Sequence, residues 1–151
     1  MALTPAKGFT LIELIILLLI AVLGFAVVGI QIGSGNQSAK LQAASRELAS
    51  ALLFAHSQAL LNRKPVSVDI NLGDNSYKIS NRDKIYYFDS AIDLSVEVAE
   101  EEFSEQQTAG IRFFGDGSST GGRVTLEWGQ QSHRVDVNWI TGETVIDHET
   151  G

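Results

Sequence analysis

Apolar positions are distributed unevenly along this chain, and the first part is the most hydrophobic. Every residue from 14 to 30 is apolar or glycine, and residues 9–12 extend this run upstream past a single charge, Glu13. As a helix, residues 9–30 would measure about 33 Å, which is enough to cross a hydrocarbon core of about 30 Å. The pattern therefore predicts a membrane-spanning helix over residues 9–32.

The second part, residues 33–64, has the spacing of an amphipathic helix. Its small and apolar residues recur every three or four positions: Leu41, Ala44, Leu48, Ala51, Leu52, Ala55 and Ala59. Pro65 predicts the end of this helix, with Arg63 and Lys64 suited to its carboxyl end. The Gly33-Ser34-Gly35 segment predicts a kink or melted turn, because each glycine weakens a helix by about 1 kcal/mol. Such a turn would be either a hinge or a simple linker.

After Pro65 the period changes to two, which is typical of β-strands. The predicted strands cover residues 66–72, 77–79, 85–88, 94–98, 111–114, 124–128, 134–139 and 144–146. The glutamate-rich residues 97–107 predict a solvated loop, with a contact for a basic partner as the alternative. The fold class is therefore α+β: a long N-terminal helix packed on an antiparallel β domain, residues 65–151.

Charge and composition exclude several classes of function. The chain has 151 residues, with 18 acidic and 11 basic side chains and a net charge of −7. A nucleic-acid binder is disfavoured, because such proteins hold phosphates with clustered Lys and Arg. The absence of cysteine from the sequence excludes disulfides, thiolate zinc sites and a cysteine nucleophile.

The sequence contains no recognisable catalytic motif. We therefore expect no enzyme activity, no metal site and no cofactor. His56, His133 and His148 are interpreted as packing or surface residues. The Gly/Ser/Thr segment at residues 115–122 lacks the lysine of a phosphate-binding loop and predicts a structural turn. The largest aromatic residues are expected in the core or on a sheet face: Phe113, Phe114, Trp128 and Trp139.

The segment Lys7-Gly8-Phe9-Thr10-Leu11-Ile12-Glu13 resembles the processing site of type IV pilins and pseudopilins. The resemblance implies that residues 1–8 form a leader, that prepilin peptidase cuts after Gly8, and that the new terminus at Phe9 is N-methylated. It also implies a role in filament assembly for Glu13, whose carboxylate would pair with the amino terminus of a neighbouring subunit. The alternatives are a plain membrane anchor with a tolerated Glu and a secretory signal, although the apolar run is long for the latter.

Residues 111–126, which read IRFFGDGSSTGGRVTL, and residues 135–143, which read VDVNWITGE, are similar to H-type minor pseudopilins of type II secretion. This group also includes FimT-type minor pilins. The resemblance implies a pilin-like fold and a structural subunit near the tip of a periplasmic pseudopilus.

The implied partners are the prepilin peptidase, the major and other minor pseudopilins, and the inner-membrane secretion platform. The implied location is the bacterial inner membrane, with a cytoplasmic N-terminus and a periplasmic β domain. The alternative is a FimT-like minor pilin for pilus assembly or DNA uptake, which would need an exposed basic patch.

Overall fold

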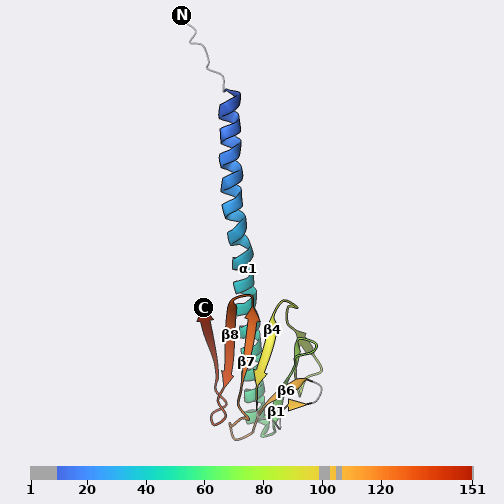
Figure 1. Ribbon diagram of the computed structural model, residues 1–151. Helices are drawn as coiled ribbons and strands as arrows, with labels where there is room; N and C mark the ends of the chain where they lie inside the picture. Colours follow the sequence, from blue (N-terminus) through green and yellow to red (C-terminus); the bar gives the residue numbers. More distant parts are fainter. Residues whose placement is uncertain (1–9, 99–102, 105–106, 151) are drawn as a thin grey trace, which may run out of the picture. The chain divides into compact units, whose positions relative to one another are not determined.

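The computed structural model describes residues 10–98, 103–104 and 107–150, with side chains left undescribed at residues 24–35, 103–104 and 148–150. The chain forms two compact units, Met1–Gln37 and Ser38–Gly151. One long helix, α1 (Leu11–Asn62), contributes residues to both units (Figure 1). Thr10 caps the helix, because its Oγ1 accepts a hydrogen bond from the Glu13 N–H at 3.3 Å.

The backbone of α1 is helical at Gly33, Ser34 and Gly35, so the predicted melted turn is wrong. Each glycine costs only about 1 kcal/mol inside a helix. A break would require a second nucleation, which is unfavourable by a factor of about a thousand. The predicted end of the helix is confirmed, since α1 stops at Asn62 and Arg63 has a left-handed φ of 50° two residues before Pro65.

Nine strands lie in the described residues and form two antiparallel sheets. The first sheet has the order β3-β2-β1-β6-β5, and the second has the order β4-β7-β8-β9. The strands are β1 (Val66–Asn71), β2 (Ser76–Ile79), β3 (Ile85–Tyr87), β4 (Asp93–Glu97), β5 (Phe103–Ser104), β6 (Thr108–Phe113), β7 (Gly122–Trp128), β8 (Gln131–Val137) and β9 (Thr144–Thr150).

All eight predicted strands are present, with ends that shift by up to three or four residues, and the predicted α+β fold is confirmed. The prediction missed β5, a two-residue strand within the glutamate-rich segment that pairs with β6. Polar and charged residues in this segment hide the strand signal, and its pairing depends on where β6 lies.

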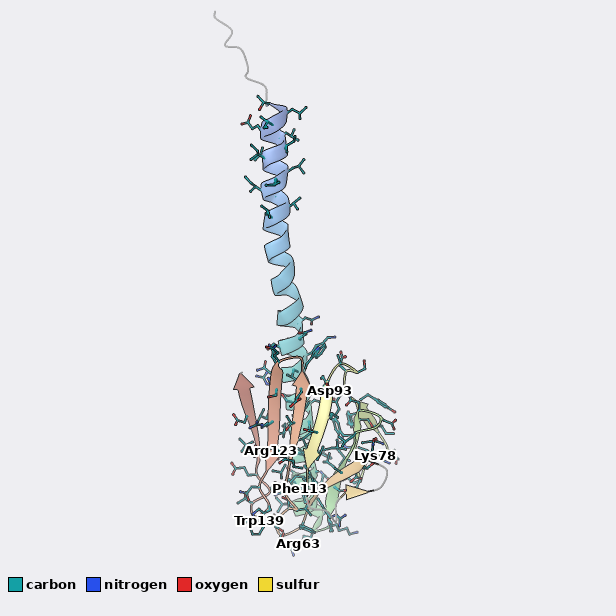
Figure 2. All side chains as sticks on the ribbon, in the orientation of Figure 1. Arg63, Lys78, Asp93, Phe113, Arg123 and Trp139 are labelled. Carbon is teal, nitrogen blue, oxygen red and sulfur yellow. The ribbon has the colours of Figure 1, made fainter. Side chains whose placement is uncertain are left out.

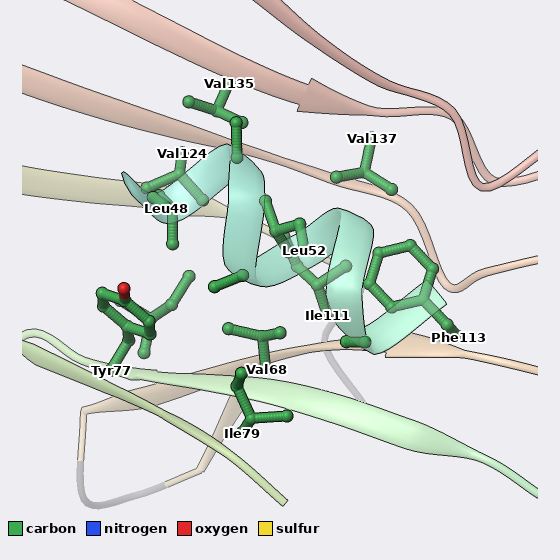
Figure 3. Packing of buried hydrophobic residues seen from close by; sticks show 14 of the residues in the cluster. Leu48, Leu52, Val68, Tyr77, Ile79, Ile111, Phe113, Val124, Val135 and Val137 are labelled. Carbon is green, nitrogen blue, oxygen red and sulfur yellow. The ribbon is translucent and has the colours of Figure 1, made fainter. Parts of the chain in front are cut away.

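The core lies where the second half of α1 packs against the inner faces of both sheets (Figure 3). The predicted helical stripe supplies Leu48 and Leu52, which are fully buried. The other side chains labelled in Figure 3 come from the first sheet (Val68, Tyr77, Ile79, Ile111 and Phe113) and from the second sheet (Val124, Val135 and Val137). The small residues Ala51, Ala55 and Ala59 let the helix backbone approach the strands closely.

Candidate assembly surfaces

The first half of α1 presents apolar side chains that its own unit leaves uncovered. Over residues 11–23 the large aliphatic side chains are all more than half exposed, from 52% at Ile15 to 79% at Leu11. An apolar surface of this extent marks a contact with a membrane or another protein. The first half of α1 is therefore the first candidate assembly surface.

Within the part of the chain whose residues the structure describes, no helix is both long and apolar enough to cross a membrane.

Glu13 lies on this surface and is the only charged residue between Thr10 and Ala39 in the sequence. It is the third residue of α1, and the Thr10-x-x-Glu13 spacing is that of a capping box. The amino-terminal end of a helix carries a partial positive charge, which favours a carboxylate in the first turn. The predicted cleavage and methylation positions, Gly8 and Phe9, lie outside the described residues. The assembly role predicted for Glu13 therefore stays a prediction.

A buried polar contact joins α1 to the second sheet. The Ser45 hydroxyl donates to the Gln42 carbonyl oxygen, and Ser45 Oγ lies 3.0 Å from Nδ1 of His133 on β8. Ser45 is 0% exposed and His133 is 8% exposed, so a substrate cannot reach this pair. The pair is a buried polar contact that holds α1 to the second sheet. The interpretation of His133 as a packing residue is confirmed. The sequence pattern did not reveal it, because residues 88 positions apart give no pairing signal.

His56 fastens the Gly/Ser/Thr loop of residues 115–122 to α1. Its Nε2–H donates to the Gly117 carbonyl oxygen at 3.1 Å, and its ring stacks on Phe113 with 5.3 Å between the ring centroids. A Cβ on Gly142 would lie 2.7 Å from both His56 Nε2 and the Gly117 oxygen, so only glycine fits there. His56 is therefore a packing residue, as expected, and the loop is a structural turn.

The same loop is bonded to the hairpin between β8 and β9. Ser119 donates its N–H to the Trp139 carbonyl oxygen at 2.9 Å and its hydroxyl to the Asn138 carbonyl oxygen at 3.0 Å. The Asn138 side chain in turn accepts hydrogen bonds from the N–H groups of Ile140 and Thr141. The end of α1, the loop and the hairpin thus form one joint. We call this joint, residues 60–65, 114–121 and 138–142, the loop end.

The aromatic predictions were only partly correct at the loop end. Phe113 is fully buried and Trp128 packs against the core, as expected. Trp139 is 66% exposed, so the expectation that it lies in the core or on a sheet face is wrong. β8 ends at Val137, and the hairpin that follows carries Trp139 away from the sheet. The loop end is therefore a second candidate assembly surface.

Electrostatic contacts at the loop end and on the second sheet are structural. The Asp116 carboxylate accepts hydrogen bonds from the hydroxyl and the N–H of Ser118, and these bonds lower its pKa. The Arg123 guanidinium donates to Asp136 at 2.6 Å, which raises the pKa of Arg123 above its usual value. Among the described residues no group of three or more His, Asp or Glu side chains could hold a metal ion.

One more titratable side chain, the phenol of Tyr77, lies in the core. Burial, followed by the neighbouring charge of Glu47, raises the pKa of Tyr77. The phenol therefore stays neutral at physiological pH. Its ring stacks on Tyr86 with 4.9 Å between the centroids, so the role of Tyr77 is packing.

Residues 44–142 match the protein-family model described as "Type II transport protein GspH". This range covers most of the second half of α1, the strands from β1 to β8 and the loop end. The chain belongs to the GspH family. The predicted H-type resemblance is thereby confirmed.

One relative of known sequence and two solved structures are similar to this chain. The chain is 27% identical over 139 residues to the type II secretion system protein H of Xanthomonas campestris pv. campestris, covering 91% of this chain and 80% of that one. Its fold is similar to that of the minor pseudopilin EpsH from the type 2 secretion system of Vibrio cholerae, with a TM-score of 0.58 and 12% identity over 72% of this chain and 97% of the other. The type IV minor pilin FimU of Pseudomonas aeruginosa gives a TM-score of 0.55 and 12% identity over 71% of this chain and 92% of the other.

Proposed function

We propose that this GspH-family chain is a minor pseudopilin, a structural subunit of the periplasmic pseudopilus of a type II secretion system. The observation that carries the proposal is the first half of α1, whose apolar side chains are uncovered over residues 11–23 and surround one carboxylate. A helix with this surface needs lipid or other helices around it. The second half of α1 belongs to a compact domain. The polar contacts described there hold its elements together, as expected for a structural subunit rather than an enzyme.

The proposed maturation follows the motif at the amino terminus. Prepilin peptidase removes residues 1–8 by cutting after Gly8, and Phe9 becomes the N-methylated terminus. Residues 9–32 anchor the subunit in the inner membrane before assembly and lie in the filament core afterwards. Residues 33–64 and 65–151 are the periplasmic part of the helix and the β domain.

Glu13 is proposed to direct assembly. A carboxylate in an apolar environment is costly unless it is paired. The new amino terminus of a neighbouring subunit at Phe9 would supply the opposite charge and would set the register between the two helices. In the mature filament this subunit would sit near the tip and join other minor pseudopilins to the major one, in contact with the inner-membrane platform during assembly, so that folded proteins are exported.

The processing step is tested by mass spectrometry of the full chain expressed with and without a prepilin peptidase. The expected result is loss of residues 1–8 together with one added methyl group on Phe9, only when the peptidase is present. Gly8→Val is the control, because its side chain blocks a site that accepts glycine. An uncut chain, or a cut beyond Ile32, contradicts the proposal.

The assembly step is tested with Glu13→Val and with Thr10→Val as a matched control in the same first turn. Glu13→Val should still be inserted and cleaved, but its recovery with the other pseudopilins should fall at least about tenfold, corresponding to the loss of one buried ion pair. Thr10→Val removes only the helix cap, which is worth about 1 kcal/mol. Normal co-assembly of Glu13→Val would contradict the pairing.

The DNA-uptake alternative lacks the basic patch that it requires. Arg123 contacts Asp136 and lies 3.9 Å from Glu97, so its charge is already neutralised. Arg112 and Arg134 also have interaction partners. Phosphate binding would have to compete with these contacts, and the net charge of −7 opposes it.

A further inference from the structure

The loop end carries large apolar side chains that the β domain leaves uncovered. Trp139, Ile140 and Leu61 are 66%, 61% and 77% exposed. They belong to the end of α1 and to the hairpin between β8 and β9, which lie far apart in the sequence. Tryptophan is among the residue types that most often anchor protein interfaces, and apolar side chains gathered on a surface mark a contact with another molecule.

The loop of residues 115–121 holds these two segments together. A Cβ on Gly115 would lie 2.8 Å from the Arg63 Cα, and a Cβ on Gly121 would lie 3.0 Å from the Trp139 Cβ. The loop thus contacts the end of α1 on one side and the hairpin on the other. Figure 2 shows Arg63 and Trp139 at the same end of the β domain. A surface that is already ordered loses little entropy on binding.

Two cations border these apolar side chains. Arg63 and Lys64 are exposed, and in the described part of the chain neither side chain has a hydrogen bond or an ion pair. Asp116 is the one carboxylate in the sequence of the loop end, and it is bonded to Ser118 within the loop. Glu143 follows directly after the loop end. The loop end itself has a net charge of +1, whereas the whole chain has −7.

The opposite end of the β domain carries unpaired acids. Asp93 on β4 and Glu127 on β7 are directly opposite each other in the strand register of the second sheet. Both side chains are exposed, and neither has a partner among the described residues. Figure 2 places Asp93 at one end of the domain and Arg63 at the other. An acidic partner is therefore repelled near Asp93 and attracted at the loop end.

The loop end is also far along α1 from the point where the chain enters the second unit. This unit begins at Ser38, and α1 ends at Asn62. The helix between these two residues is about 36 Å long, at about 1.5 Å a residue. The proposed membrane anchor, residues 9–32, precedes Ser38. A subunit that joins two kinds of neighbour needs two different binding surfaces, and the loop end is the one remote from the anchor along the helix.

A lipid surface and a second copy of this chain fit the loop end less well. Electrostatic binding to anionic lipid takes about four to eight clustered Lys and Arg residues. The loop end has two, on a chain whose net charge is −7. A minor subunit that lies between different pseudopilins does not repeat along the filament, so copies of it do not meet. The charges of the loop end favour a different protein that presents carboxylates.

We infer that the loop end binds another minor pseudopilin, at a surface where carboxylates border an apolar pocket. Trp139 fills the pocket, with Ile140 and Leu61 around it. Arg63 and Lys64 pair with the carboxylates. The inference rests on the proposed function and names the surface through which this subunit meets its minor neighbours. The major pseudopilin is then bound through other surfaces.

Photocrosslinking tests this contact in the mature full chain, residues 9–151. The photoreactive amino acid p-benzoylphenylalanine replaces Ile140, and the chain is mixed in detergent with each other pseudopilin of the same secretion system in turn. One of the minor pseudopilins should be crosslinked with a yield at least about tenfold above that of the major pseudopilin. The control carries the same amino acid in place of Tyr87, which is 70% exposed on the edge strand β3. A yield no higher than that of this control overturns the inference.

Charge reversal tests the chemistry of the contact. Arg63→Glu with Lys64→Glu should lower the crosslink yield about tenfold. Arg63→Lys with Lys64→Arg keeps both positive charges and should keep the yield. Lys78→Glu with Lys84→Glu is the matched control, because it reverses two exposed cations of the first sheet. A loss in either of these two variants equal to that of the charge reversal overturns the inference.

Truncation of the tryptophan tests the apolar part of the contact. Trp139→Ala should lower the yield about tenfold. The midpoint of thermal unfolding should not change, because the side chain is exposed. Tyr87→Ala is the matched control for an exposed aromatic ring, and an equal loss of crosslink with it contradicts the anchoring role. Should Trp139→Ala lower the midpoint, the charge variants decide, since they leave the hairpin unchanged.

Three further outcomes overturn the inference in favour of another occupant. The first two are a crosslink to the major pseudopilin alone and a crosslink to a second copy of this chain alone. The third is binding of the loop end to vesicles that contain anionic lipid, abolished by Trp139→Ala, without a crosslink to any pseudopilin. Cleavage after Gly8 is measured when the mature chain is prepared. Normal cleavage without the crosslink refutes this contact alone, whereas failed cleavage refutes the proposed function.

Discussion

The two halves of α1 are both rich in apolar residues, yet they meet different surroundings. Over residues 11–23 nearly every position is apolar and every described side chain is exposed. Over residues 41–59 apolar residues occupy one stripe, and Leu41, Leu48, Leu52, Ala55 and Ala59 are completely buried. A narrow stripe can be covered by one domain, whereas an apolar surface on all sides of a helix requires lipid or several neighbouring molecules. Periodicity, more than hydrophobicity, decides which half packs within its own chain.

The same substitution in both halves should have very different effects on stability. Leu48→Ala should lower the free energy of unfolding of the β domain by about 2–5 kcal/mol, because it leaves a cavity in the core. Leu17→Ala should change it by less than about 0.5 kcal/mol, since Leu17 is exposed. Urea unfolding of the full chain in detergent, followed by near-UV circular dichroism, measures both. Equal losses would contradict the contrast between the halves.

The second half of α1 also holds the loop end in place through His56. A substitution at Gly142, which lies against His56, tests this contact. Gly142→Ala should cost about 3 kcal/mol, because the methyl group meets His56 and the Gly117 oxygen and because φ at this position is 65°. Gly129→Ala is the matched control, since φ there is 63° but no atom lies within 4 Å. It should cost only about 1 kcal/mol. The same urea unfolding reports both values, and equal costs would show that contact with His56 is unimportant.

Loss of the buried polar contact between Ser45 and His133 should lower stability by a smaller amount. Ser45→Ala leaves the His133 Nδ1 without the hydroxyl that lies 3.0 Å away, which should cost about 1–3 kcal/mol. Ser57→Ala removes an exposed hydroxyl that bonds only within α1 and should cost less than about 0.5 kcal/mol. Thermal unfolding of the two variants gives the difference. A neutral Ser45→Ala would mean that the helix is held to the second sheet by apolar packing alone.

The smallest expected effect concerns pH and the ion pair between Lys40 and Asp89. The Ala91 N–H and the Lys40 ammonium, 3.0 Å away, lower the pKa of Asp89. Because the pKa of Asp89 is lower in the folded state, its ionised carboxylate stabilises the fold above about pH 4, the unfolded value. This stabilisation is lost as the pH falls through the folded pKa. Asp89→Asn should therefore flatten the decline of stability below pH 4. Asp83→Asn, at an exposed position, is the control, and an unchanged decline in Asp89→Asn would contradict this role.

Local sequence patterns predicted the elements of this fold more reliably than their contacts. The stripe from Leu41 to Ala59 and the alternation after Pro65 depend on which side of one element faces the core, and both predictions are confirmed. The glycines at 33 and 35 were overinterpreted, because a local weakness does not break a helix whose neighbours continue it. The exposure of Trp139 was missed because apolarity alone predicts burial.

The sequence by itself determined the family, the amphipathic stripe and eight of the strands in the described residues, since each depends on neighbouring residues. The processing motif around Gly8 and Glu13 stays a prediction. Only the tertiary structure decided how the nine strands of the described residues divide into two sheets, that His133 contacts Ser45 in the core, and that His56 holds the loop end. It also decided that Asp93 faces Glu127 while Arg63 lies at the other end of the domain. These contacts join residues far apart in the chain. Period and spacing tell which face of an element is buried, but the partner across the core is set by how the whole chain packs.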